Sequence, residues 1–278
     1  MRVKTSSRDS NDLLKVAFSK ITNPISVSRV GLGGETLTTY AVYNNMQIPD
    51  QWKFWLKNNA GFYGSENYRK YADLYYSAIQ ESDYHAYWGT GDIFQVAEDF
   101  LVPKSKIHID PSALESFRFD SPWTSSLADK KVLVIHPFKD TIDKQLLIKD
   151  KIWSNPQVLS FGETTILKST QSIGGIGPDK DWFESFDNMK GQIAKIDFDV
   201  ALLGCGAYGI PLMGWIKDSL MKSAIYVGGG LQLYFGIRGK RWDRSPDVSK
   251  FYNDSWVRCS EQEKPRHINM AGDEASYF

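Results

Sequence analysis

Residues 131–135, with the sequence KVLVI, are the segment that decides the fold. A continuous run of aliphatic and β-branched residues is typical of a strand that is buried on both faces of a parallel sheet. Residues 198–203 (FDVALL) and 223–227 (SAIYV) have the same character, and residues 25–30 (ISVSRV) alternate between apolar and polar positions. Strands of this kind indicate a sheet whose faces are covered.

Helical patterns separate these strands along the chain. They cover residues 141–153, 182–196 and 210–221, and residues 65–80 form a further amphipathic helix. Strands that alternate with helices predict an α/β fold, with a parallel, Rossmann-like sheet flanked by helices. Ligands of such sheets bind at the carboxyl ends of the strands, next to a switch in strand order. We therefore expect functional residues directly after the strands.

The composition is that of a globular protein and excludes several classes of partner. The 33 Lys and Arg residues balance 33 Asp and Glu residues, so we do not expect nucleic acid as a partner. Cys205 and Cys259 are far apart in the sequence, which predicts neither a disulfide framework nor a zinc site. We expect no signal peptide and no transmembrane segment. Together these features predict a soluble, cytoplasmic protein.

A glycine-rich turn follows one of the buried strands. In GCGAYG, residues 204–209, Gly204, Gly206 and Tyr208 stand where a helix begins, and main-chain N–H groups at such a position can hold a diphosphate. The same spacing also fits a tight turn that packs strand against helix, and both interpretations stay open. A nicotinamide dinucleotide is disfavoured, because the next strand ends in Gly228 and not in the acidic residue that binds its ribose.

The stretch GGGLQLYFGIRGKRW, residues 228–242, joins glycines to basic side chains. Its leading glycines allow a ligand to approach the main chain, and Arg238, Lys240 and Arg241 concentrate positive charge in a chain that is neutral overall. Guanidinium groups match phosphate oxygens in geometry. We therefore favour phosphate binding over a solvated charged loop.

Three acid–base candidates stand near expected strand ends. His136 follows KVLVI and could be a base, a hydrogen-bond donor to a phosphate, or a structural residue. Glu35 lies in the first glycine turn, SRVGLGGE, where a carboxylate could take a proton, bind a divalent metal, or only stabilise the start of a helix. Asp83, which ends a tyrosine-rich helical segment, is the third candidate.

The segments VLVIHPF, FDVALLGCGAYGIPL and GGGLQLYFGIRGKRW together resemble GT-D-like sugar-nucleotide glycosyltransferases. These enzymes occur in bacterial surface-polysaccharide clusters and have relatives in large DNA viruses. The resemblance covers residues 121–256, and residues 25–37 match more weakly. It implies a GT-D-like version of the Rossmann-like sheet.

Typical members of this family carry an Arg-x-Gly turn followed by an Asp-x-Glu metal motif. Arg29, Gly31 and Glu35 match that pattern, but residues 32–34 (LGG) stand where the first acid would be sought. The resemblance therefore implies at most weak binding of Mg²⁺ or Mn²⁺ through Glu35, and it leaves metal-independent activity open.

The resemblance implies transfer of a sugar from a nucleotide-diphosphate donor to a hydroxyl of a glycan. A UDP-sugar such as UDP-glucose or UDP-xylose is the favoured donor. Glu35 would act as an acid–base residue or as a metal ligand, and His136 would orient the donor. The aromatic content of 14% fits a carbohydrate acceptor. The residues expected to bind the donor are Arg29, Gly31, Gly33, Gly204, Gly206, Tyr208, Gly228, Gly229, Gly230, Gln232, Arg238, Lys240 and Arg241.

Two other functions remain as alternatives. One is a non-catalytic glycan- or nucleotide-binding protein of polysaccharide assembly, and the other, less favoured, is a nicotinamide-dependent oxidoreductase. We expect a single domain over residues 1–278. Its parts would be an N-terminal half with the RVGLGGE turn (1–120), a nucleotide-binding half (121–242) and an extended C-terminal arm (243–278).

Overall fold

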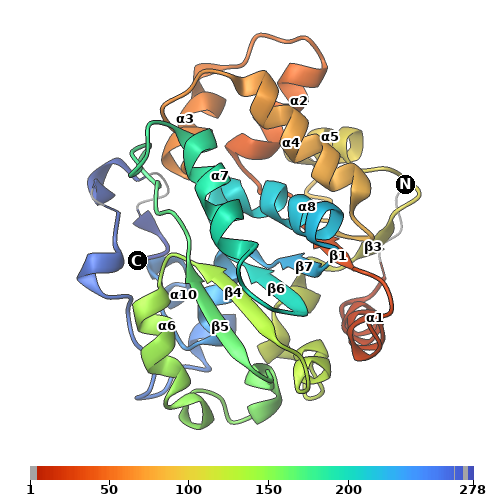
Figure 1. Cartoon of the computed structure of the whole chain (residues 1–278), viewed down its shortest axis with the longest axis vertical. Coiled ribbons are helices and arrows are strands. Elements are labelled where there is room, and N and C mark those ends of the chain that lie inside the picture. The colour runs from red at the N-terminus through yellow and green to blue at the C-terminus, as the bar shows by residue number, and fades with distance from the viewer. Residues whose placement is uncertain (1–4, 266, 272–274) are drawn as a thin grey trace.

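A sheet of seven parallel strands forms the centre of the computed structural model, which describes residues 5–265, 267–271 and 275–278 (Figure 1). The strands lie in the order β3-β2-β1-β7-β6-β4-β5. Helices flank the sheet, so the predicted α/β class is confirmed. The strand bounds are β1 Ser26–Ser28, β2 Tyr84–Ala86, β3 Ile107–Ile109, β4 Val132–His136, β5 Thr164–Lys168, β6 Val200–Leu203 and β7 Ser223–Tyr226.

The central strands bury apolar side chains on both faces of the sheet. In β4, Val132 and Val134 belong to one hydrophobic cluster, whereas Leu133 and Ile135 belong to a second. All four side chains are buried. Because neither face meets water, the strand has no polar position between its ends, and this is why KVLVI predicts it so directly.

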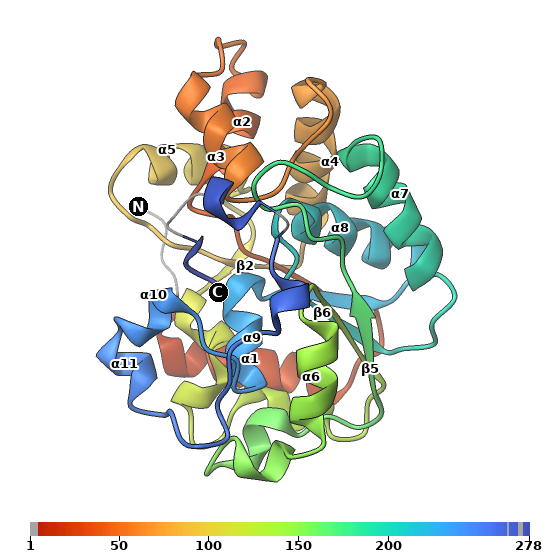
Figure 2. The same ribbon diagram turned by 90° about the vertical axis from the view of Figure 1, so that its left-hand side faces the viewer.

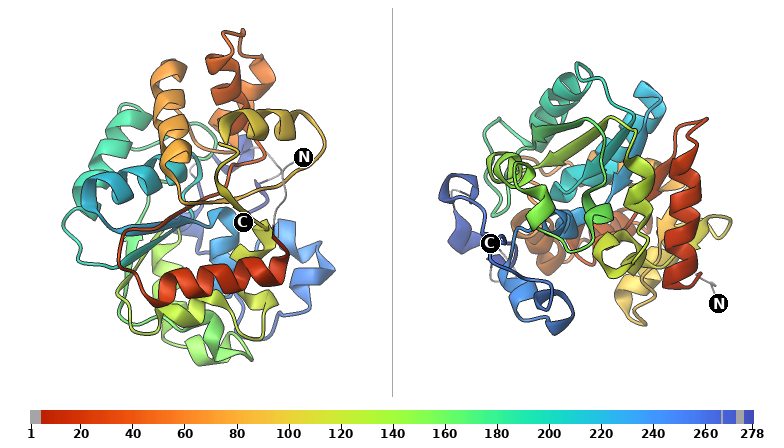
Figure 3. Two further views of the ribbon diagram at one scale, coloured as in Figure 1. Left: turned by 90° about the vertical axis from the view of Figure 1, so that its right-hand side faces the viewer. Right: turned by 90° about the horizontal axis from the view of Figure 1, so that it is seen from below.

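Two sets of helices cover the two faces of the sheet. Helices α1, α6 and α9 contribute to the first cluster, and α3, α4, α5, α7 and α8 contribute to the second. Figure 3 shows α1 lying away from α4, with the strands between them. The helix bounds are α1 Ser7–Ser19, α2 Gly34–Tyr43, α3 Asp50–Asn58, α4 Tyr68–Glu81, α5 Ile93–Leu101, α6 Lys139–Leu146, α7 Trp182–Ile193, α8 Gly209–Leu220, α9 Leu231–Tyr234, α10 Lys240–Asp243 and α11 Pro246–Ser249.

The chain leaves the sheet toward opposite faces at two pairs of neighbouring strands. Strands β4 and β6 are paired, and they are followed by α6 on one face and α8 on the other. Strands β1 and β7 are also paired. The chain continues from β1 into α2, which packs on α4, and from β7 into α9 on the other face. Diverging loops of this kind open a crevice at the carboxyl ends of the strands.

Several element boundaries differ from those expected from the sequence. The helix expected from residue 65 begins at Tyr68, because the Asn67 side chain caps it by accepting a hydrogen bond from the Lys70 N–H at 3.0 Å. The helix expected over residues 141–153 is α6, which ends at Leu146.

The C-terminal segment after α10 is irregular but packed. It contains the single turn α11 and short 3₁₀ turns, and its Ile237–Val257 bridge joins it to the chain before α10. Trp256 and Phe278 are buried in the same cluster as α6. Figure 2 shows the C-terminus beside α9 and α10. No helix in the described ranges is long and apolar enough to span a bilayer.

A pair of glycine-to-alanine substitutions tests the packing of α8 on α4. A Cβ atom at Gly214 would lie 2.5 Å from the Ala78 Cβ, whereas nothing lies within 4 Å of a Cβ at Gly191 in α7. Gly214→Ala should lower the free energy of unfolding by about 1–3 kcal/mol through overpacking. Gly191→Ala should raise it by up to about 1 kcal/mol through helix propensity. Urea unfolding measures both, and equal effects would contradict the close contact.

Candidate functional site

A cavity of about 350 Å³ lies at the carboxyl edge of the sheet. Its walls come from the loops after β1, β2, β4, β5, β6 and β7, so it opens at both places where neighbouring loops diverge. This is where a parallel α/β sheet binds its ligands. The residues that line it include Arg29, Gly31, Gly33, Glu35, Asn59, Trp88, His136, Gln171, Ser172, Gly204, Gly206, Tyr208, Tyr226, Gly229, Gln232, Arg241 and Tyr277.

Arg29 brings a positive charge into the cavity directly after β1. Its guanidinium carbon lies 5.4 Å from the Trp88 ring centroid and 5.9 Å from that of Tyr226. The Nε atom is buried and has no hydrogen-bond partner among the described residues. No carboxylate in the described ranges forms an ion pair with the guanidinium either. A cation held between aromatic faces is well placed to bind an anionic ligand.

Gly228 makes room for this guanidinium at the end of β7. Its φ of +72° favours glycine, and a Cβ atom there would lie 1.9 Å from the Arg29 Nη2. The glycines that follow differ from it. A Cβ at Gly229 would meet the Tyr277 ring, and nothing lies within 4 Å of one at Gly230. Gly228 therefore contributes to the site by leaving space for the Arg29 guanidinium, against which its main chain packs.

Glu35 places a buried carboxyl group in the first turn of α2. The carboxylate lies against Gly31 and Gly33 of the preceding loop, and Thr36 holds that loop by donating to the Gly31 carbonyl at 2.6 Å. Burial raises the pKa of Glu35, and its own main-chain N–H and the Arg29 charge oppose the rise. A carboxyl with a raised pKa exchanges its proton closer to neutral pH than an ordinary glutamate does.

His136 is a neutral hydrogen-bond donor at the end of β4. Its Nδ1 accepts a hydrogen bond from the Phe138 N–H at 3.1 Å, which assigns the proton to Nε2. Burial lowers the pKa of His136 to about 3. At neutral pH the ring is therefore poorly suited to act as a base, because Nδ1 is already bonded and the pKa is low. Of the roles that the sequence left open, the geometry favours a hydrogen bond from Nε2–H to a ligand.

The GCGAYG turn is built mainly for packing. The Ala207 N–H donates to the Ala60 carbonyl at 2.8 Å, and the Gly204 N–H donates to the Ile135 carbonyl at 3.0 Å. Tyr208 is buried and stacks on Trp182 at 4.9 Å. The Gly204 and Ala207 N–H groups are thus used within the fold, although Gly204, Gly206 and Tyr208 line the cavity.

The basic cluster of residues 238–241 does not converge on the cavity. The Arg238 Nε lies 3.3 Å from an Asp243 oxygen, its guanidinium lies over the Tyr252 ring, and neither Arg238 nor Lys240 lines the cavity. Arg241 does line it, and its Nη1 donates to the Tyr277 hydroxyl at 3.2 Å. Gln232 supports the same segment by donating to the Tyr277 carbonyl.

Asp83 lies at the opposite edge of the sheet from the cavity. It precedes β2 instead of following a strand, accepts a hydrogen bond from the Ser26 N–H and pairs with Lys217 at 3.0 Å. Asp83 therefore does not line the cavity. The three-residue strand after it is too short to recognise from its sequence.

Several lining residues have no clear sequence signal. Trp88, Asn59, Gln171 and Tyr277 come from loops whose positions depend on the folded sheet. Trp88 follows β2, which the sequence does not predict, so the aromatic content of the chain is the only signal that could have pointed to it.

Glu35 is the acidic residue of the cavity lining. Within the described residues, no group of three or more His, Cys, Asp or Glu side chains is placed to hold a metal ion.

Comparison of the chain with protein-family models, with curated proteins and with solved structures found no match.

Lowering the pH should destabilise the wild type more than a His136→Asn variant, which keeps an acceptor near the Nδ1 position. The folded pKa of about 3 lies below the ordinary value of 6.5, so the unfolded chain binds more protons between these values. Neutral His136 makes its full contribution to the free energy of unfolding above pH 6.5. Below pH 6.5 this contribution falls by about 1.4 kcal/mol per pH unit. Urea unfolding at pH 7, 6 and 5 measures this difference. Equal losses of unfolding free energy in the wild type and in His136→Asn would contradict the prediction.

Proposed function

We propose that this chain is a glycosyltransferase that binds a nucleotide-diphosphate sugar in the carboxyl-edge cavity and transfers the sugar to a glycan hydroxyl. The observation that carries the proposal is the Arg29 guanidinium, which lines the cavity between two aromatic rings without a carboxylate partner in the described ranges. A planar guanidinium can bind two phosphate oxygens at once. A UDP-sugar such as UDP-glucose or UDP-xylose is the favoured donor.

The donors around the cavity suit a diphosphate leaving group. Arg29 supplies the charge, and the Nε2–H of His136 supplies a neutral hydrogen bond. Arg241 adds a second guanidinium at the exposed rim. As the bond from the sugar carbon to the diphosphate breaks, its electron pair leaves with the diphosphate. These donors then stabilise the added negative charge.

Glu35 is the group that we assign to proton transfer. In a direct displacement the acceptor oxygen bonds to the sugar carbon, and its proton passes to the Glu35 carboxylate. Burial keeps the pKa of that carboxyl above its ordinary value, which makes it a stronger base than an exposed glutamate. The nearby Arg29 charge keeps a share of the group ionised.

A non-catalytic binding protein is the competing function. Residues 32–34, LGG, supply no acid beside Glu35, so a protein that kept the cavity but lost catalysis would look much the same. Such a protein would bind a nucleotide or a glycan without turning it over.

Nucleotide affinity tests the role of Arg29. Arg29→Gln should raise the Kd for UDP at least tenfold, because it removes a hydrogen bond to a charged group worth about 1.5–3 kcal/mol. Arg29→Lys should recover only part of the affinity, since an ammonium lacks the planar fork. Arg238→Gln is the matched control, because that guanidinium is engaged by Asp243 outside the cavity. Isothermal titration of each folded variant gives the Kd, and equal losses for Arg29 and Arg238 would count against the site.

Turnover tests the role of Glu35. Glu35→Gln should lower the release of UDP from UDP-glucose or UDP-xylose, in the presence of glycan acceptors, at least about a hundredfold. UDP affinity should stay within a few-fold of wild type. The wild-type rate should rise with pH through the raised pKa, because the ionised carboxylate is the base. Asp83→Asn is the control with unchanged turnover, and a Glu35→Gln variant of near wild-type rate would place the base elsewhere.

A further inference from the structure

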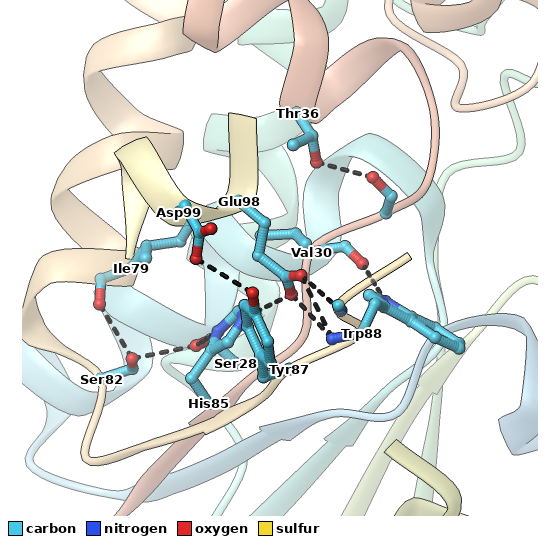
Figure 4. Close-up of polar contacts among 12 residues, drawn as sticks. Ser28, Val30, Thr36, Ile79, Ser82, His85, Tyr87, Trp88, Glu98 and Asp99 are labelled. Atoms are coloured by element: carbon cyan, nitrogen blue, oxygen red, sulfur yellow. Dashed lines mark hydrogen bonds and ion pairs between the residues drawn. The ribbon is translucent and has the colours of Figure 1, made fainter. Parts of the chain in front are cut away.

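A buried chain of polar side chains lies beneath the cavity, between β1, β2 and α5 (Figure 4). The Ser28 Oγ lies 2.8 Å from the His85 Nδ1, and the His85 Nε2 lies 3.0 Å from the Glu98 Oε1. All three side chains are fully buried. A serine, a histidine and a carboxylate also make up the triad of acyl-transfer enzymes, but here no substrate can reach the serine.

Glu98 holds the chain that follows β2. Its carboxylate accepts hydrogen bonds from the Trp88 N–H at 3.0 Å and from the Gly89 N–H at 3.2 Å, in addition to its contact with His85. A buried carboxylate is costly unless such donors surround it. The Glu98 carboxylate therefore fixes the main chain at Trp88.

The Trp88 side chain in turn holds the end of β1. Its indole N–H donates to the Val30 carbonyl at 2.9 Å, and its ring faces the Arg29 guanidinium. Figure 4 shows Trp88 next to both groups, with its main-chain N–H toward the Glu98 carboxylate and its indole N–H toward the Val30 carbonyl.

The polar chain thus holds both neighbours of Arg29. Ser28, on one side, is bonded through its hydroxyl to His85, and Val30, on the other, is bonded through its carbonyl to Trp88. Both bonds lead back to Glu98. A side chain whose flanking residues and ring platform are fixed loses less freedom when it binds a ligand.

We propose that Glu98 is a positioning residue, which acts through Trp88 and His85 to hold the Arg29 guanidinium in its place in the cavity. This inference rests on the proposed function only for the ligand that Arg29 binds. The position of Arg29 itself can be tested without any ligand.

The ligand-free test is NMR spectroscopy of the full chain. The indole N–H of Trp88 and the Nε–H of Arg29 are assigned by their loss in Trp88→Phe and Arg29→Gln. Glu98→Gln should shift both resonances, because an amide cannot accept all the bonds that the carboxylate accepts. Asp99→Asn is the matched control on the same helix, since Asp99 is exposed and accepts from the Tyr87 hydroxyl instead. Unchanged resonances in folded Glu98→Gln would overturn the proposal.

A double-mutant cycle with UDP supplies the second readout. Glu98→Gln should raise the Kd about tenfold in the wild-type background and have no further effect in the Arg29→Gln background. A merely structural role would lower the melting temperature and leave the Kd of the folded protein unchanged, and that result would overturn the proposal. If Glu98→Gln does not fold, Trp88→Phe replaces it, because it keeps a ring but removes the bond to Val30.

The two proposals can fail separately. A wild type that does not bind UDP would refute the nucleotide site, and the two resonances would still decide whether Glu98 positions Arg29. A wild type that binds UDP, with an Arg29-dependent Kd that Glu98→Gln and Trp88→Phe leave unchanged, would refute the positioning role alone.

Discussion

An all-parallel sheet must be covered on both faces, and this constraint shapes the molecule. Every connection between parallel strands has to cross one face or the other. In this chain the connections after β4 and β6 diverge, as do those after β1 and β7. The cavity between these loops is a consequence of covering the sheet. Arg29 and His136 line this cavity because they stand at or directly after the ends of β1 and β4.

Burial then sets the charge of these groups. Removal from water favours the neutral form of any titratable side chain, so it raises the pKa of Glu35 and lowers that of His136. A guanidinium stays charged under the same conditions. The cavity lining therefore places the permanent positive charge of Arg29 near the Glu35 carboxyl group, whose pKa burial raises.

The sequence predicts the sheet and part of the site, for physical reasons that differ between residues. Arg29, Glu35 and His136 follow strands, so the rule for parallel sheets brings them to the cavity. Arg238 does not reach it, because Asp243 and Tyr252 engage its side chain, and such a contact is not visible in a string of charges. Trp88 and Glu98 depend on a strand of three residues whose pairing comes from its neighbours.

The pairing of β1 with β7 joins segments nearly two hundred residues apart, such as Val27 with Ile225. Contacts of such sequence separation form late and slowly, because a long loop must close first. The contact between Arg29 and Gly228 depends on this pairing, because the two residues follow β1 and β7. A chain on the ribosome that has not yet reached β7 would thus carry most of the helices but not the complete cavity. A ligand that binds the finished cavity would selectively stabilise chains whose sheet has closed.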